Sequence, residues 1–119
     1  MISTHAEKAA ELFKAGYNCS QSVAAAFCDV TKTDEKTMLA TAAPFGGGFG
    51  RHRGVCGAIS GGCLVLGLLY GYTDPSDKTA KSEHYALVRD FMARFSVRFG
   101  SVIFRELLRG GTAGGGAGG

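Results

Sequence analysis

The sequence lacks the short motifs that mark the commonest cysteine chemistries. Its four cysteines are Cys19, Cys28, Cys56 and Cys63, and they form neither a Cys-x-x-Cys pair nor a Cys-x-x-Cys-His motif. The chain also has no clustered pair of histidines. These absences argue against thioredoxin-type motif chemistry, covalent haem attachment and a local zinc knuckle. Any metal site must therefore be assembled from segments that lie far apart in the sequence.

Signals for export and for nucleic-acid binding are also missing. Residues 1–14 contain no apolar stretch long enough for a secretory signal and no twin-arginine pair, so we expect a cytoplasmic protein. In that compartment a cysteine is normally a free thiol, a metal ligand or a redox group. Thirteen Lys and Arg against ten Asp and Glu give a net charge of +3, but no strand interleaves aromatic and basic residues. We therefore expect no nucleic-acid partner.

The composition indicates one globular domain. The chain has 119 residues, of which 45% are hydrophobic and 19% charged, which is enough to bury one core. No alternating strand pattern and no internal repeat is present, so the predicted fold is all-α, a compact bundle of about five to six helices. We assign residues 1–109 to this domain. Residues 110–119, almost purely Gly and Ala, are interpreted as an unstructured tail, either engineered or standing for unidentified residues.

Capping signals divide the first half of the chain. A helix is expected from residue 3 or 4 to residue 14, and Asn18 is a good N-cap for a second helix over residues 19–31. Acidic residues at 34 and 35 open a short third helix, which ends at Pro44.

The second half is predicted to hold a helical pair. Residues 55–72 contain no charge and many glycines, which predicts a central, buried, glycine-rich helix; a membrane span is the less favoured alternative. Asp74 is expected to cap a long amphipathic helix that has Pro75 at its first position and ends at Gly100. A last short helix is expected over residues 101–109.

Two cysteines are the candidate catalytic residues. Cys19 follows Asn18, and Cys56 follows a glycine-rich loop, so both are placed at helix starts where the helix dipole favours a thiolate. Arg51, His52 and Arg53 precede Cys56 and are expected to tune both thiols. The alternative is that both cysteines are small buried apolar residues. Cys28 and Cys63 are expected to be core residues.

The loop PFGGGFGRHRG, residues 44–54, has five glycines in eleven positions. It lacks the third glycine of a dinucleotide fingerprint and no strand precedes it, so a Rossmann site is rejected. Glycine amides next to a helix start can still form an anion nest. The candidate cofactor-binding residues are Gly46, Gly47, Gly48, Gly50 and Arg51. His52 lies four residues before Cys56 and is a candidate metal ligand together with Cys19 and Cys56.

Four segments carry a family resemblance: GYNCSQSV at 16–23, FGGGFGR at 45–51, VCGAISG at 55–61 and FGSVIFRELL at 99–108. They resemble the C_GCAxxG_C_C family of redox-active proteins, which has a related domain in split-Soret cytochrome c. The resemblance spans about residues 5 to 109 and implies redox activity, with an iron–sulfur cluster or another metal as cofactor. It matches Cys19 and Cys56 to the first two family cysteines. Phe104 stands at the third position, and the fourth has no counterpart.

Two functions follow as hypotheses, and neither decides whether the chain is an enzyme. In the first, a small redox-active or metal-binding protein uses Cys19 and Cys56 as its working thiols. A redox partner protein is then expected, or a homo-oligomer that brings two cysteine pairs together to supply the four thiolates of a cluster. In the second, a non-catalytic subunit packs against a partner through residues 57–71. The redox hypothesis further predicts that Cys19 and Cys56 lie near one another, with the glycine loop over them.

Overall fold

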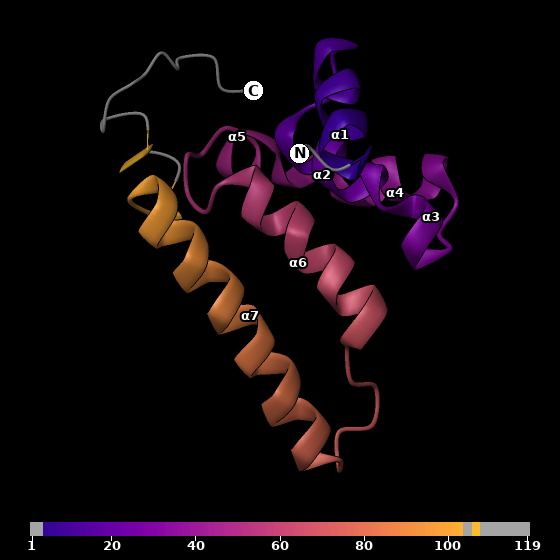
Figure 1. Ribbon diagram of the computed structural model, residues 1–119, viewed down its shortest axis with the longest axis vertical. Helices are drawn as coiled ribbons and strands as arrows, with labels where there is room; N and C mark the ends of the chain where they lie inside the picture. Colours follow the sequence, from indigo (N-terminus) through magenta and orange to yellow (C-terminus); the bar gives the residue numbers. More distant parts are fainter. Residues whose placement is uncertain (1–3, 104–105, 108–119) are drawn as a thin grey trace.

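The computed structural model describes residues 4–103 and 106–107, and its elements are helical (Figure 1). The first five are α1 (Thr4–Lys14), α2 (Cys19–Ala26), α3 (Cys28–Thr31), α4 (Glu35–Ala42) and the 3₁₀ turn η1 (Ala43–Phe45). They are followed by α5 (Gly46–Phe49), α6 (Gly57–Tyr70) and α7 (Lys78–Phe99). No strand occurs within these ranges, where Val55 and Ile103 form an isolated antiparallel bridge. The all-α prediction is confirmed.

Local capping sets most helix starts as predicted. The Asn18 side chain accepts a hydrogen bond from the Gln21 amide at 2.9 Å, and the Gln21 side chain accepts one from the Asn18 amide at 3.1 Å. This reciprocal capping box satisfies two amides that the first turn of α2 leaves without partners. Asp34 caps α4 by accepting a hydrogen bond from the Thr37 amide at 2.9 Å.

Three predicted boundaries are wrong. The helix expected over residues 19–31 breaks at Phe27, whose ring stacks on His5 with centroids 4.4 Å apart. Asp74 caps a turn at Ser76, and α7 begins later, after Asp77, which accepts from the Ala80 amide at 3.0 Å. Residues 101–103 are not helical, because Ile103 pairs with Val55 instead. The remainder of the expected last helix is described as helical at 106–107, and its other positions lie outside the described residues.

Two hydrophobic clusters form the core. The first joins α1, α2 and α4 and is centred on small or flexible side chains: Leu12, Ala24, Ala25, Met38 and Ala42. Alanines on α2 let its neighbours approach closely. The second is centred on Cys56 and Ile59 and includes residues of α7. In Figure 1, α6 and α7 form a hairpin that extends away from the cluster of α1 to α5.

The glycine-rich helix is buried along its first nine residues and more exposed toward its end. Gly57, Ile59, Gly61 and Val65 are buried, whereas Gly67, Leu68 and Tyr70 are exposed. Within residues 4–103 and 106–107, no helix is both long and apolar enough to cross a lipid bilayer.

Candidate functional site

The starts of α2 and α6 meet at a junction that contains Cys19 and Cys56. A Cβ built on Gly57, the residue after Cys56, would lie 3.2 Å from the Cβ of Cys19 and 3.2 Å from the Ser20 amide. The same Cβ would lie 3.2 Å from the carbonyl oxygen of Phe45, at the edge of the glycine loop. Three segments that are distant in sequence therefore converge here. The predicted proximity of the two cysteines is confirmed.

Asn18 and Gln21 hold the α2 side of the junction. The Asn18 side-chain amide donates to the Ala43 carbonyl at 3.1 Å, and the Gln21 side-chain amide donates to the Leu39 carbonyl at 3.0 Å. The start of α2 is thus tied to the end of α4 and to η1. A Cβ on Gly46 would overlap the Asn18 side chain, so this position requires glycine for steric reasons. The sequence identified Asn18 as a cap, but it did not identify Gln21 as a second tether; its position three residues later was the available signal.

The Cys56 side of the junction is held by the segment that follows α7. The Cys56 amide donates to the Val102 carbonyl at 2.8 Å, next to the Val55–Ile103 bridge. Cys56 itself is the N-cap residue of α6 and is 7% exposed. Its placement at a helix start agrees with the sequence prediction, and its position in the second core cluster agrees with the alternative of a buried residue. Cys19 is only partly buried.

Burial overrides the helix position at Cys19. The expected effect of a helix start is a lower thiol pKa. Instead, desolvation raises the pKa of Cys19, and the charge on the neighbouring Cys56 raises it further, while the Cys19 backbone amide opposes both effects. Arg51, His52 and Arg53 are exposed and are not among the groups that shift the pKa of Cys19, and their tuning of the two thiols stays a prediction.

The glycine loop is folded on itself. The amides of Arg51, Arg53 and Gly54 donate to the carbonyls of residues 46, 47 and 48, at 3.2, 3.1 and 3.0 Å. Gly48 has a φ of 74°, and a Cβ there would lie 2.7 Å from the Arg53 Cα, so the turn requires glycine. Of the candidate cofactor-binding residues, only Arg51 uses its amide in these three bonds. Cofactor binding by Gly46, Gly47, Gly48, Gly50 and Arg51 stays a prediction.

Cys28 and Cys63 do not belong to the junction. Cys28 lies on α3 and packs against the first core cluster, and Cys63 packs against the second. Burial raises the pKa of both thiols. Cys63 is two turns along α6 from Cys56, about 10 Å at the rise of an α-helix. Both cysteines contribute to packing, as predicted, although neither is fully buried.

The donor set of the junction does not fit a four-thiolate iron–sulfur cluster, because only Cys19 and Cys56 converge there. In the described part of the chain, no three His, Cys, Asp or Glu side chains gather closely enough to hold a metal ion. Cys19, Cys56 and His52 therefore do not form the three-ligand site that the sequence suggested. Phe104, at the third family position, lies outside the described residues.

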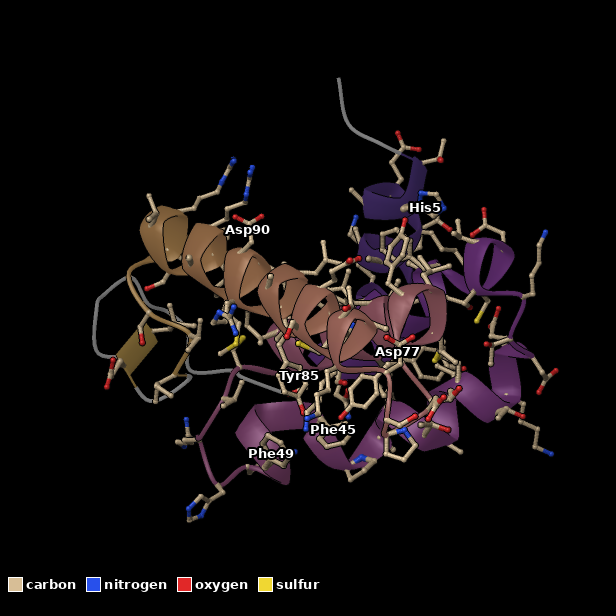
Figure 2. The ribbon with its side chains drawn as sticks, turned by 90° about the horizontal axis from the view of Figure 1, so that it is seen from below. His5, Phe45, Phe49, Asp77, Tyr85 and Asp90 are labelled. Carbon is tan, nitrogen blue, oxygen red and sulfur yellow. The ribbon has the colours of Figure 1, made fainter. Side chains whose placement is uncertain are left out.

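An apolar groove of about 500 Å³ opens between the glycine loop, α6 and α7. Phe45 and Phe49, both labelled in Figure 2, form one wall and contact each other edge to face with centroids 4.9 Å apart. Cys63 and Ile59 of α6 also line it. The groove is thus built against the same loop and helix as the cysteine junction.

Comparison with known proteins identifies a family. The model of the family described as "Putative redox-active protein (C_GCAxxG_C_C)" matches residues 17–117. No curated protein and no solved structure matches the chain. The matched range includes the three converging segments and all four cysteines, and it extends into the Gly/Ala-rich end. With most of its length matched, and with Cys19 and Cys56 brought together at two helix starts, the chain belongs to the C_GCAxxG_C_C family of redox-active proteins.

Proposed function

We propose that the protein is a thiol–disulfide redox protein in which Cys19 and Cys56 alternate between two thiols and one disulfide. The observation that carries this proposal is the contact of the Cys19 side chain with Gly57, next to Cys56. A disulfide needs Cα atoms within about 7 Å, which a side chain packed on the adjacent residue favours. The electron acceptor is a disulfide on a partner protein or small molecule.

Exposure assigns different roles to the two thiols. Cys19 is the more accessible, so its thiolate attacks one sulfur of the substrate disulfide and releases the other sulfur as a thiol after protonation. The buried Cys56 then attacks the Cys19 sulfur of this mixed disulfide and releases the second substrate thiol. Two protein thiols become one disulfide, the substrate disulfide becomes two thiols, and the two protein protons end on the released thiols. The reverse sequence oxidises a partner dithiol.

The electrostatics of the pair support sequential reaction. Burial and the neighbouring Cys56 raise the pKa of Cys19, so its thiolate is a minor species near neutral pH. A single thiolate is sufficient for each exchange step. Since the two thiols and the substrate disulfide balance the reaction, the proposal requires no metal, in keeping with a junction that offers two thiolates rather than four.

The alternative function, a non-catalytic subunit that packs through residues 57–71, loses part of its basis. A Cβ on Gly61 would lie 2.7 Å from the Ser20 carbonyl of α2, and a Cβ on Gly62 would lie 2.5 Å from the Phe91 ring of α7. The chain already uses these glycines for its own helix packing. Gly67 is the open position in this helix, with no atom within 4 Å of a built Cβ among those described.

The test is capture of the paired thiols by phenylarsine oxide, an arsenical that forms a stable complex with two neighbouring thiols. We expect the reduced protein to bind one equivalent. Cys19→Ser and Cys56→Ser should each abolish binding, whereas Cys28→Ser and Cys63→Ser, as matched controls, should retain it. Oxidation by a small disulfide followed by peptide mapping should then show a Cys19–Cys56 bond. Arsenical binding that survives Cys19→Ser, or a disulfide between other cysteines, would refute the proposal.

A further inference from the structure

The outer face of α7 carries an exposed stripe with the spacing of a helix interface. Its members recur at intervals of four and three: Glu83, Leu87, Asp90, Arg94 and Val97. This is the a/d spacing of a coiled-coil seam. Val97 is 88% exposed and Leu87 is 42% exposed, although both are apolar. Ala86 and Ala93 flank the stripe and are also exposed, so a second helix can approach closely.

The stripe is not needed for packing within the chain. The inner face of α7 contacts α6 through Phe91, Met92 and Phe95, which belong to the second core cluster. None of the 22 residues of α7 is fully buried. Figure 2 shows Asp90 on the side of α7 opposite the labelled Tyr85. The helix therefore has one occupied face and one free face.

The sequence of the stripe is complementary to itself when read in reverse. In an antiparallel pair of α7 helices centred at the level of Met92, Asp90 of one copy faces Arg94 of the other, and Leu87 faces Val97. A two-fold axis repeats each contact, which gives two ion pairs flanked by two apolar contacts. Within one chain, Asp90 and Arg94 already pair at 2.9 Å while remaining exposed, so both are placed to share a second partner. We propose that the occupant of this face is the α7 helix of a second copy of the chain.

A groove beside the stripe could receive side chains of the second helix. It has a volume of about 560 Å³ and lies between α7 and the α2–α3 region, with α6 as its floor. Leu87, Asp90 and Arg94 line one side, and Val23 and Phe27 line the other. The apolar walls would contact the apolar side chains of the second helix, while the charged pair fixes its direction and register.

This dimer does not combine the two thiol pairs. The junction lies near the C-terminal end of α7, because the Cys56 amide bonds to Val102 just beyond it. Antiparallel α7 helices in the proposed register place their C-terminal ends about 20 Å apart along the axis. The association is therefore independent of the thiol chemistry, and it should persist in reducing agent and in the Cys19→Ser variant.

The experiment is sedimentation velocity of the full chain in reducing buffer over a wide concentration range. We expect a dimer of the 12.4 kDa chain. Asp90→Arg alone and Arg94→Asp alone each replace two attractive pairs with two repulsive ones, and each should weaken the dimer by about tenfold or more. Mixing these two variants should restore association as a one-to-one heterodimer, and the double variant should dimerise like the wild type.

Arg89→Asp is the control, since it makes the same charge change as Arg94→Asp at an exposed position outside the stripe, and it should leave the dimer unchanged. All substituted positions are exposed, and circular dichroism checks that each variant is helical. A wild type that stays monomeric at the highest concentration would overturn the proposal. So would a dimer that resists both single charge changes, or two variants that fail to associate when mixed.

Discussion

Gly61 is the position at which a single methyl group should most clearly test how α2 and α6 pack. A Cβ at Gly61 would lie 2.7 Å from the Ser20 carbonyl oxygen and 3.2 Å from both the Ser20 Cα and the Val23 Cβ. The closest of these is a backbone atom, which cannot move aside as a side-chain end can. Gly61→Ala therefore requires α2 and α6 to separate, and these helices form the cysteine junction.

Two effects of opposite sign determine how much Gly61→Ala changes the free energy of unfolding. Replacing glycine by alanine inside a helix stabilises it by about 1 kcal/mol. Overpacking against backbone costs about 2–3 kcal/mol, the upper part of the usual range. We expect Gly61→Ala to lower the free energy of unfolding by about 1–2 kcal/mol, which corresponds to a decrease in Tm of about 4–8 °C. The same displacement should reduce disulfide formation between Cys19 and Cys56.

Gly67→Ala is the matched control in the same helix. A Cβ there would have no atom within 4 Å, so the substitution should carry no packing cost. The higher helix propensity of alanine should then raise the free energy of unfolding by about 1 kcal/mol. Urea unfolding of the wild type and both variants, in reducing buffer and at one protein concentration, measures the difference. If Gly61→Ala were as stable as Gly67→Ala, the close approach of the two helices would be refuted.

Two further predictions concern the α2 side of the junction. The Ser20 hydroxyl is fully buried and has no hydrogen-bond partner among the described residues, so Ser20→Ala should raise the free energy of unfolding by about 1 kcal/mol. Urea unfolding measures this gain against the exposed Ser82→Ala control, which should gain less. A loss of stability in Ser20→Ala would show that the hydroxyl has a partner. Burial and Cys56 raise the pKa of Cys19, so folding favours the protonated thiol: this stabilisation is full below the pKa of the unfolded chain and is lost as pH rises through the higher folded pKa. The alkaline decrease in stability should be smaller in Cys19→Ser, and an unchanged decrease would contradict the assignment.

Much of the helix layout could be predicted from the sequence, because caps act over a single turn. Asn18 and Asp34 accept hydrogen bonds from amides three residues later, and Gly100 ends α7 with a φ of 96°, a conformation that glycine adopts without strain. The break at Phe27 was not predictable in this way. Its ring stacks on His5 of α1, a contact between residues that no local pattern connects.

For the candidate site, the sequence by itself determined which residues are the candidates: two cysteines at helix starts, within the motifs of a redox-active family. Only the tertiary structure decided their environment. Gly57 brings Cys19 next to Cys56, and the burial that this contact requires raises the pKa of Cys19 where the helix position alone would lower it. The physical reason is one of range: capping and the helix dipole depend on neighbouring residues, whereas desolvation depends on every segment that packs around a group.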